Sequence, residues 1–153
     1  MEEYTLKLIH DPQTHDLEAF WSILRAFNDE KAGPSNFQPL VVLLRDKDGN
    51  MVGGLNAETY WQWLYVENIA IKEGMRRLGF GSRMLQLAEQ EAVQRGCRYA
   101  YLSTYSFQSQ LFYERRGYVS FGTLDDFPEG HRRIFLKKSL AKLSDSAAQP
   151  ARD

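Results

Sequence analysis

The chain has 153 residues, of which 43% are hydrophobic and 25% are charged, and its formal net charge is -1. This length and composition are typical of one soluble globular domain, and the near-neutral charge excludes bulk attraction to nucleic acid or to an anionic membrane. No run approaches the roughly 18 apolar residues that span a bilayer, and the acidic start and the single cysteine, Cys97, indicate the cytoplasm.

The predicted elements begin with a strand over residues 4–9, where polar and apolar residues alternate. A helix follows, capped by Thr14 or Asp16 and broken at residues 33–36. Its apolar positions recur at helical spacing and form one face: Leu17, Phe20, Trp21, Leu24 and Phe27. Residues 40–44 and a segment starting at Met51 form a hairpin around the turn at 46–50. A second hairpin, turning at residues 60–62, leads into a strand over 63–71.

The second half of the chain alternates helices with strands. Residues 81–94 predict an amphipathic helix with Met84, Leu85, Ala88 and Ala92 on its apolar face. A strand over 99–104, a helix over 107–115 and strands over 117–124 and 132–137 follow. Early hairpins and late crossovers predict an α/β fold, with a mixed sheet of six to seven strands flanked by helices, in a single domain over residues 1–140. Residues 141–153 are small and polar and predict a flexible tail.

The stretch 76–82, Arg-Arg-Leu-Gly-Phe-Gly-Ser, joins a buried strand to the amphipathic helix. Gly79 and Gly81 lack a Cβ, so the backbone can approach a ligand, and the first amides of a helix carry partial positive charge. These features predict a phosphate or pyrophosphate site, although an ordinary strand-to-helix turn would use the same residues. The spacing excludes a Walker loop, because no Lys follows Gly81, and a Rossmann fingerprint, because the third glycine is missing.

Arg76, Gly79 and Gly81 match the acetyl-CoA signature of the GNAT family of N-acetyltransferases, in which Gln or Arg is followed by two glycines at this spacing. The neighbouring blocks also match over residues 40–140, including a helix that closes with Phe112-Tyr113 before Gly117-Tyr118. The chain therefore resembles a small bacterial member of this family. The resemblance implies a GNAT-like sheet with a splayed central pair of parallel strands, and an N-acetyltransferase that uses acetyl-CoA as co-substrate and no metal.

The resemblance also implies which residues hold acetyl-CoA. The strand before the signature would bond the pantetheine arm through its backbone, and the loop would offer amides to the pyrophosphate. The implied residues are Ile69, Ala70, Ile71, Arg76, Arg77, Leu78, Gly79, Phe80, Gly81 and Ser82. Where the family often has an Asn that bonds the arm, this chain has Ser106, so we expect Gln108 to supply the missing amide.

Two residues are predicted to carry the transfer. Tyr113 matches the family tyrosine that protonates the departing thiolate, and Glu67 is the candidate base, acting through water. Without the resemblance, Tyr113 would be a half-buried helix tyrosine, and Glu67 a strand charge that pairs with an arginine or faces water. Strand alternation predicts that residues 63, 65, 67, 69 and 71 share one face.

The predicted acceptor is a primary amine of a small molecule, which attacks the thioester directly in a ternary complex. A protein N-terminus or lysine is the alternative acceptor, and a CoA-binding sensor without catalysis is the alternative activity. A set of aromatic residues would suit a cationic or apolar amine, or would only pack the core: Tyr60, Trp61, Trp63, Tyr65 and Tyr105. The three histidines lack metal-ligand spacing. Because many family members dimerise, a homodimer is also expected.

Overall fold

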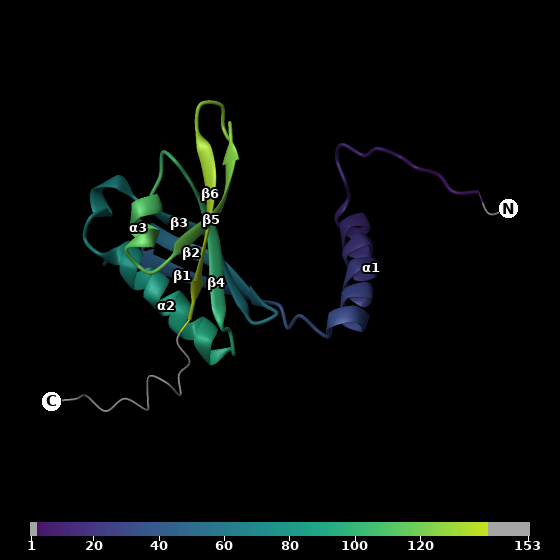
Figure 1. Ribbon diagram of the computed structural model, residues 1–153, viewed down its shortest axis with the longest axis horizontal. Helices are drawn as coiled ribbons and strands as arrows, with labels where there is room; N and C mark the ends of the chain where they lie inside the picture. The colour runs from purple at the N-terminus through teal and green to yellow at the C-terminus, as the bar shows by residue number, and fades with distance from the viewer. Residues whose placement is uncertain (1–2, 141–153) are drawn as a thin grey trace. The chain divides into compact units, whose positions relative to one another are not determined.

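The computed structural model describes residues 3–140 and divides the chain into two compact units, Met1–Ser35 and Asn36–Asp153 (Figure 1). The first unit contains one helix, preceded by a segment that forms no helix or strand, and the second contains the whole sheet. The single domain over residues 1–140 stays a prediction, and the predicted tail at 141–153 lies outside the described residues.

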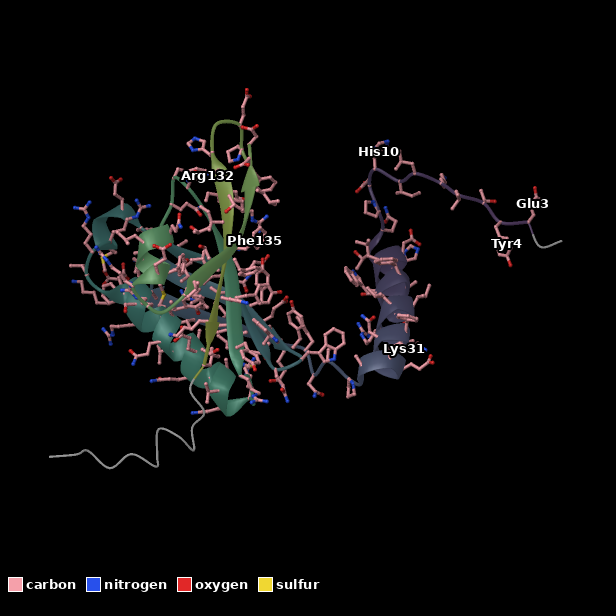
Figure 2. The ribbon with its side chains drawn as sticks, in the orientation of Figure 1. Glu3, Tyr4, His10, Lys31, Arg132 and Phe135 are labelled. Atoms are coloured by element: carbon pink, nitrogen blue, oxygen red, sulfur yellow. The ribbon has the colours of Figure 1, made fainter. Side chains whose placement is uncertain are left out.

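The first unit contains helix α1, Thr14–Ala32, which begins after Gln13 and ends at Gly33. The Gly33 amide donates to the Asp29 carbonyl with a φ of 78°, a left-handed value that glycine adopts without strain. The predicted strand over residues 4–9 is wrong, because these residues belong to no helix or strand. A strand needs a neighbouring strand for its backbone hydrogen bonds, and no described residue before Gln38 is in a strand. Figure 2 labels Tyr4 and His10 on the extended segment and Lys31 in α1.

The second unit is built on a six-stranded mixed sheet in the order β1-β2-β3-β4-β6-β5. The strands are β1 (Gln38–Arg45), β2 (Met51–Tyr60), β3 (Trp63–Ile71), β4 (Tyr99–Tyr105), β5 (Val119–Asp125) and β6 (Arg132–Ser139). β1, β2 and β3 form the two predicted antiparallel hairpins. The second of them turns through Trp61 and Gln62, both with positive φ, which is the two-residue turn that matches the twist of a hairpin. The predicted α/β fold with a mixed sheet is confirmed.

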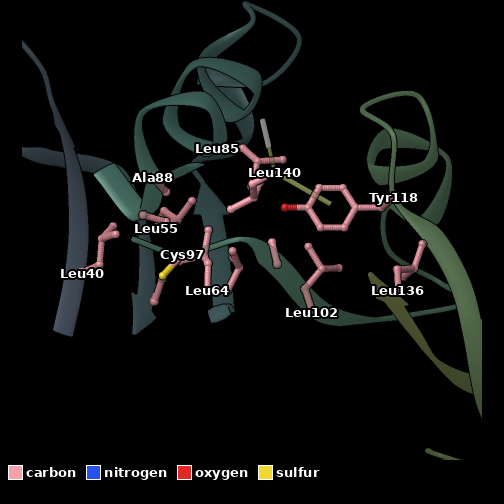
Figure 3. Close-up of a cluster of buried hydrophobic side chains, with 14 of the residues drawn as sticks. Leu40, Leu55, Leu64, Leu85, Ala88, Cys97, Leu102, Tyr118, Leu136 and Leu140 are labelled. Atoms are coloured by element: carbon pink, nitrogen blue, oxygen red, sulfur yellow. The ribbon is translucent and has the colours of Figure 1, made fainter. Parts of the chain in front are cut away.

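Three helical segments connect the later strands: the short 3-10 turn η1 (Glu73–Met75), α2 (Phe80–Gln94) and α3 (Gln110–Glu114). α2 buries the four side chains that the sequence predicts, Met84, Leu85, Ala88 and Ala92. They pack with Leu64 and the other buried residues of the sheet in one hydrophobic cluster (Figure 3). Burial of a leucine-sized side chain contributes roughly 1.5–3 kcal/mol, so this interface holds α2 firmly against the sheet.

The two central parallel strands separate halfway along their length, as the family resemblance implies. β3 pairs with β4 only from Trp63–Tyr99 to Val66–Leu102. Beyond this point β3 pairs with β2 alone, and β4 pairs with β6 alone. The edge of β3 that faces the gap, residues 67–71, therefore has backbone groups without a strand partner.

Candidate active site

A cleft of about 950 Å³ opens where β3 and β4 separate. This volume lies at the upper end of the usual range for small-molecule and cofactor sites. All but one of the predicted site residues line it: Glu67, Ile69, Ala70, Ile71, Arg76, Arg77, Gly79, Phe80, Gly81, Ser82, Gln108 and Tyr113. The exception is Leu78, whose side chain is exposed outside the cleft.

The glycine-bearing loop has the geometry of an anion seat. Gly79 adopts a φ of 82° directly before the first residue of α2, so the free amides of the helix N-terminus face the cleft lining. A Cβ at Gly81 would lie 3.4 Å from Ile71 Cδ1 and 3.4 Å from Phe112 Cζ, in van der Waals contact with both side chains. The loop therefore fits the predicted pyrophosphate of CoA, with backbone donors and room for close approach.

Arg116 adds a cation to this seat and was not predicted from the sequence. Its guanidinium lies 3.6 Å from the centre of the Phe112 ring, donates from Nε to Ser82 Oγ at 3.0 Å, and donates to the Phe112 carbonyl at 2.7 Å. These contacts fix the charge beside the first turn of α2, where Arg116 lines the cleft. Only its position three residues after Tyr113, just beyond the end of α3, would have pointed to it.

Glu67 occupies a β-bulge. Asn56 of β2 pairs with Asn68 and Ala57 pairs with Val66, so Glu67 has no partner across the hairpin. The extra residue reverses the alternation, which is why Ile69 and Ile71 pack against the core. The predicted shared face of residues 63, 65, 67, 69 and 71 is therefore wrong for the last two.

The bulge leaves the Glu67 side chain exposed at the cleft, where Asn56 Nδ2 donates to its Oε2 at 2.9 Å. Among the described residues no arginine pairs with it, so of the two alternatives to the base role, the charge facing water is the one that the structure shows. Glu58 on β2 lies close enough to interact, because burial and the charge of Glu67 raise the pKa of Glu58. Two carboxylates therefore stand near one another at this side of the cleft.

Tyr113 reaches the cleft from α3, and its ring packs edge-on against Phe112 and Tyr118, at centroid distances of 5.0 and 6.0 Å. Burial raises the pKa of the Tyr113 phenol above its usual value, because the phenolate would lose its hydration. The group is thus held in its protonated form, which is the form that a proton donor needs.

Gln108 lies at the start of the turn that leads into α3. Its Oε1 accepts from Tyr105 N at 3.1 Å and from Thr104 Oγ1 at 3.3 Å, so the carbonyl end is fixed to β4. The amide nitrogen is the end that remains to donate, as the prediction requires. Ser106 accepts from the Arg132 amide at 3.0 Å and does not line the cleft.

The predicted aromatic set forms two groups on the face of the sheet that α2 does not cover. Tyr65 stacks on Tyr101 at 4.7 Å, and the Tyr101 hydroxyl bonds the Tyr60 hydroxyl. Tyr105 instead stacks on Phe107 and Phe127. Of the predicted set, only Tyr65 and Tyr105 line the cleft. Among residues 3–140, no helix is long and apolar enough to cross a membrane, and no cluster of three or more His, Cys, Asp or Glu could hold a metal ion.

Comparison with known proteins identifies related acetyltransferases. Residues 5–118 match the Acetyltransferase (GNAT) family. An acetyltransferase of Agrobacterium fabrum is 35% identical over 115 residues, which cover 75% of this chain and 84% of the relative. A blasticidin-S acetyltransferase of Streptomyces morookaense is 37% identical over 93 residues, which cover 60% of this chain and 68% of the relative.

Solved structures show the same fold. A crystal structure from Agrobacterium tumefaciens, assigned as an acetyltransferase, has a TM-score of 0.81 and 31% identity and covers 91% of this chain and 100% of that one. A Bacillus anthracis structure, assigned as a streptothricin acetyltransferase and in complex with acetyl coenzyme A, has a TM-score of 0.59 and 21% identity. It covers 71% of this chain and 64% of that one, and at this identity it supports the fold alone.

Proposed function

Because this chain belongs to the GNAT family of acetyltransferases and uses acetyl-CoA, we propose that it acetylates a primary amine of a small molecule by direct attack in a ternary complex. The observation that carries the proposal is the convergence of four features on one cleft: the glycine-bearing loop, the unpaired edge of β3, Glu67 and Tyr113. They are the four parts that such a transfer needs, namely an anion seat, an arm contact, a base and an acid. The single, buried cysteine supports a cytoplasmic location.

The cofactor-binding role is proposed for two segments. The amides of the loop from Gly79 to Ser82, with Arg116 beside them, would hold the pyrophosphate. The backbone of residues 69–71 would bond the pantetheine arm in the manner of an added strand, because this edge has no strand partner. Bound there, acetyl-CoA supplies an activated thioester, which the chain's own residues then orient.

Glu67 is the proposed base. Its carboxylate is exposed and already fixed by Asn56, so it can accept a proton from the ammonium form of the acceptor through one water. The acceptor nitrogen must be neutral to attack, and Glu58 adds a second negative charge that draws the cationic amine to this position.

Tyr113 is the proposed acid. It extends from α3, on the side of the sheet that carries α2, whereas Tyr65 lies on the other side. A phenol kept protonated by burial can donate its proton to the leaving sulfur as the thioester bond breaks. The acceptor would approach from the side of Tyr65, so that base and acid act from opposite faces of the splayed strands.

The acceptor is the least constrained part of the proposal. One relative is named a blasticidin-S acetyltransferase, and this supports a small-molecule amine over a protein. The aromatic and acidic groups near Glu67 would suit a cationic amine.

A panel of small amines, screened by release of the free CoA thiol, tests this function. We expect thiol release to depend on one class of amine, and to fall in Tyr113→Phe but not in Tyr99→Phe, which removes a hydroxyl outside the cleft. If the wild type binds CoA in calorimetry but transfers to no amine, the chain is a sensor and the proposal fails. Transfer to peptide N-termini or lysines in preference to every small amine would instead overturn the acceptor class.

A further inference from the structure

Arg133 is a charged residue of the cleft that the proposed reaction does not use. It lies on β6 directly before the buried Ile134, and its register partner is Tyr105 at the end of β4. Ile134 and Leu136 point into the core, so alternation directs Arg133 and Phe135 to the opposite face. This is the face of Tyr65, from which the acceptor would approach; Phe135 is labelled in Figure 2.

The Arg133 guanidinium is held rigidly. Its Nε donates to Ser103 Oγ at 2.8 Å. Its central carbon lies 5.7 Å from the ring centre of Tyr105, 5.3 Å from that of Phe127 and 5.2 Å from that of Phe135. Three rings within the range of cation–π attraction fix the plane of the group, so little entropy remains to be lost when it binds a ligand.

The terminal nitrogens of Arg133 are available to donate hydrogen bonds to a ligand. Within residues 3–140, none of the ion pairs involves Arg133, and its only side-chain hydrogen bond is the one from Nε. A half-buried guanidinium without an acidic partner is unusual for a structural role, because its lost hydration is not repaid by a counter-charge. A planar fork with free N–H groups at a cleft is instead suited to binding a carboxylate through two parallel hydrogen bonds.

Charges of both signs lie near Tyr65. Glu67 and Arg133 line the same cleft as Tyr65, and Glu58 is the register partner of Tyr65 across the β2–β3 hairpin. A molecule seated on Tyr65 would present its amine to the two carboxylates and could present an anionic group to Arg133 at the same time.

We propose that Arg133 binds a carboxylate of the acceptor, and that the acceptor is an amino-acid-like molecule carrying both an amine and a carboxylate. This inference rests on the proposed acetyl transfer and deepens it by naming the acceptor class. Arg133 is thus a specificity-determining residue, and its hydrogen bonds to the carboxylate position the amine of the acceptor next to Glu67.

Matched acceptor pairs test the inference. Each ω-amino acid is compared with its own carboxamide, in which the distant amine keeps nearly the same basicity, and kcat/KM is measured by thiol release. α-Amino acids and dipeptides form two further arms that separate a free amino acid from a peptide C-terminus. We expect the acids to exceed their amides by about 10- to 100-fold, the range of a charge-assisted hydrogen bond.

The variants assign this preference to Arg133. Arg133→Gln should lower kcat/KM for the acids to that for the amides, and Arg133→Lys should retain an intermediate preference, because it keeps the charge but loses the fork. Arg98→Gln, which removes an exposed charge outside the cleft, should leave the acid-to-amide ratio unchanged. The melting temperature and acetyl-CoA affinity of each variant check that it is folded.

A second readout does not depend on turnover. The best acid and its amide are titrated by calorimetry into the protein loaded with CoA, which has no acetyl group to transfer. The wild type should bind the acid more tightly by the same factor, and Arg133→Gln should lose this difference. Equal use of acids and amides by the wild type, or an unchanged ratio in Arg133→Gln, overturns the inference but leaves the proposed function intact. If the wild type acetylates neither the acids nor the amides, the inference and the proposed function are both wrong.

Discussion

At the scale of single residues, the cleft assigns different tasks to groups whose surroundings differ. Glu67 is exposed on a bulge and fixed by Asn56, whereas Tyr113 is largely buried between two rings. The exposed carboxylate is open to an incoming proton, and the buried phenol keeps its proton and can donate it. In the proposed reaction, these surroundings suit Glu67 to the role of base and Tyr113 to that of acid.

Removal of the phenol tests the second assignment. Tyr113→Phe should lower kcat by about 10²-fold, because the thiolate would leave without a positioned proton donor. The KM for acetyl-CoA should change little, since the ring and its packing remain. Steady-state kinetics with the best amine measure both constants, and an unchanged kcat would show that water or another group protonates the sulfur.

The raised pKa of Tyr113 predicts the alkaline side of the pH profile. Its ordinary pKa is about 10, and burial raises it further, so the acid form persists through that pH. With saturating substrates, kcat should therefore show no descending limb between about pH 8 and pH 10. A limb below pH 9 that disappears in Tyr113→Phe would contradict the assignment.

At the scale of elements, the site depends on two local departures from regular structure. The bulge at Glu67 turns that side chain toward the cleft and returns Ile69 and Ile71 to the core. The left-handed Gly79 ends the loop and starts α2 with its free amides at the cleft. In the proposed reaction the strand supplies the base and the helix N-terminus binds the anion, and both elements pack against the core.

Gly79→Ala should be costly for this reason. An L-residue at a φ of 82° is strained by about 1–2 kcal/mol, although no atom lies within 4 Å of the added Cβ. Urea unfolding should show that loss, and the KM for acetyl-CoA should rise as the loop relaxes. Gly74→Ala is the matched control, because Gly74 has ordinary φ and open space. Equal effects of the two changes would exclude the backbone explanation.

A partly buried group of three polar side chains, Glu89, Tyr118 and Lys138, links α2 to the end of the chain's sheet. The Tyr118 hydroxyl donates to Glu89 Oε1 at 3.0 Å, and Lys138 Nζ lies 2.9 Å from Glu89 Oε2. Figure 3 shows the Tyr118 ring among the core leucines. Tyr118→Phe should lower the free energy of unfolding by about 1.5–3 kcal/mol, the range for a hydrogen bond to a charged group, as measured by urea unfolding. An unchanged free energy would mean that solvent replaces the phenol.

The same group of side chains predicts a loss of stability at high pH. Burial and the charge of Glu89 raise the pKa of Tyr118 in the folded state above its unfolded value. Below about pH 10 both states keep the proton and no slope arises, whereas above it the unfolded state ionises first. The free energy of unfolding should therefore fall as pH rises past 10, and the fall should be shallower in Tyr118→Phe. An identical slope in both proteins would exclude Tyr118 as a source.

At the scale of the whole molecule, features encoded by neighbouring residues were predictable and those set by distant pairing were not. The buried face of α2 and the glycine-bearing loop follow from local spacing. The sequence over residues 4–9 alternates but forms no strand, and the reversal at Glu67 depends on the register with β2. Arg116 and Arg133 reach the cleft from α3's end and from β6, so no local motif marks them.

The central claim is that one cleft passes an acetyl group from acetyl-CoA directly to an amine. The most direct test incubates the protein and its best amine with acetyl-CoA deuterated in the acetyl group, and follows amine, thiol and intact protein by mass spectrometry. We predict one labelled N-acetyl product for each CoA thiol released, with the mass of the protein unchanged throughout. Label that appears on the protein before it appears on the amine, or thiol release without a labelled amine, would contradict the claim.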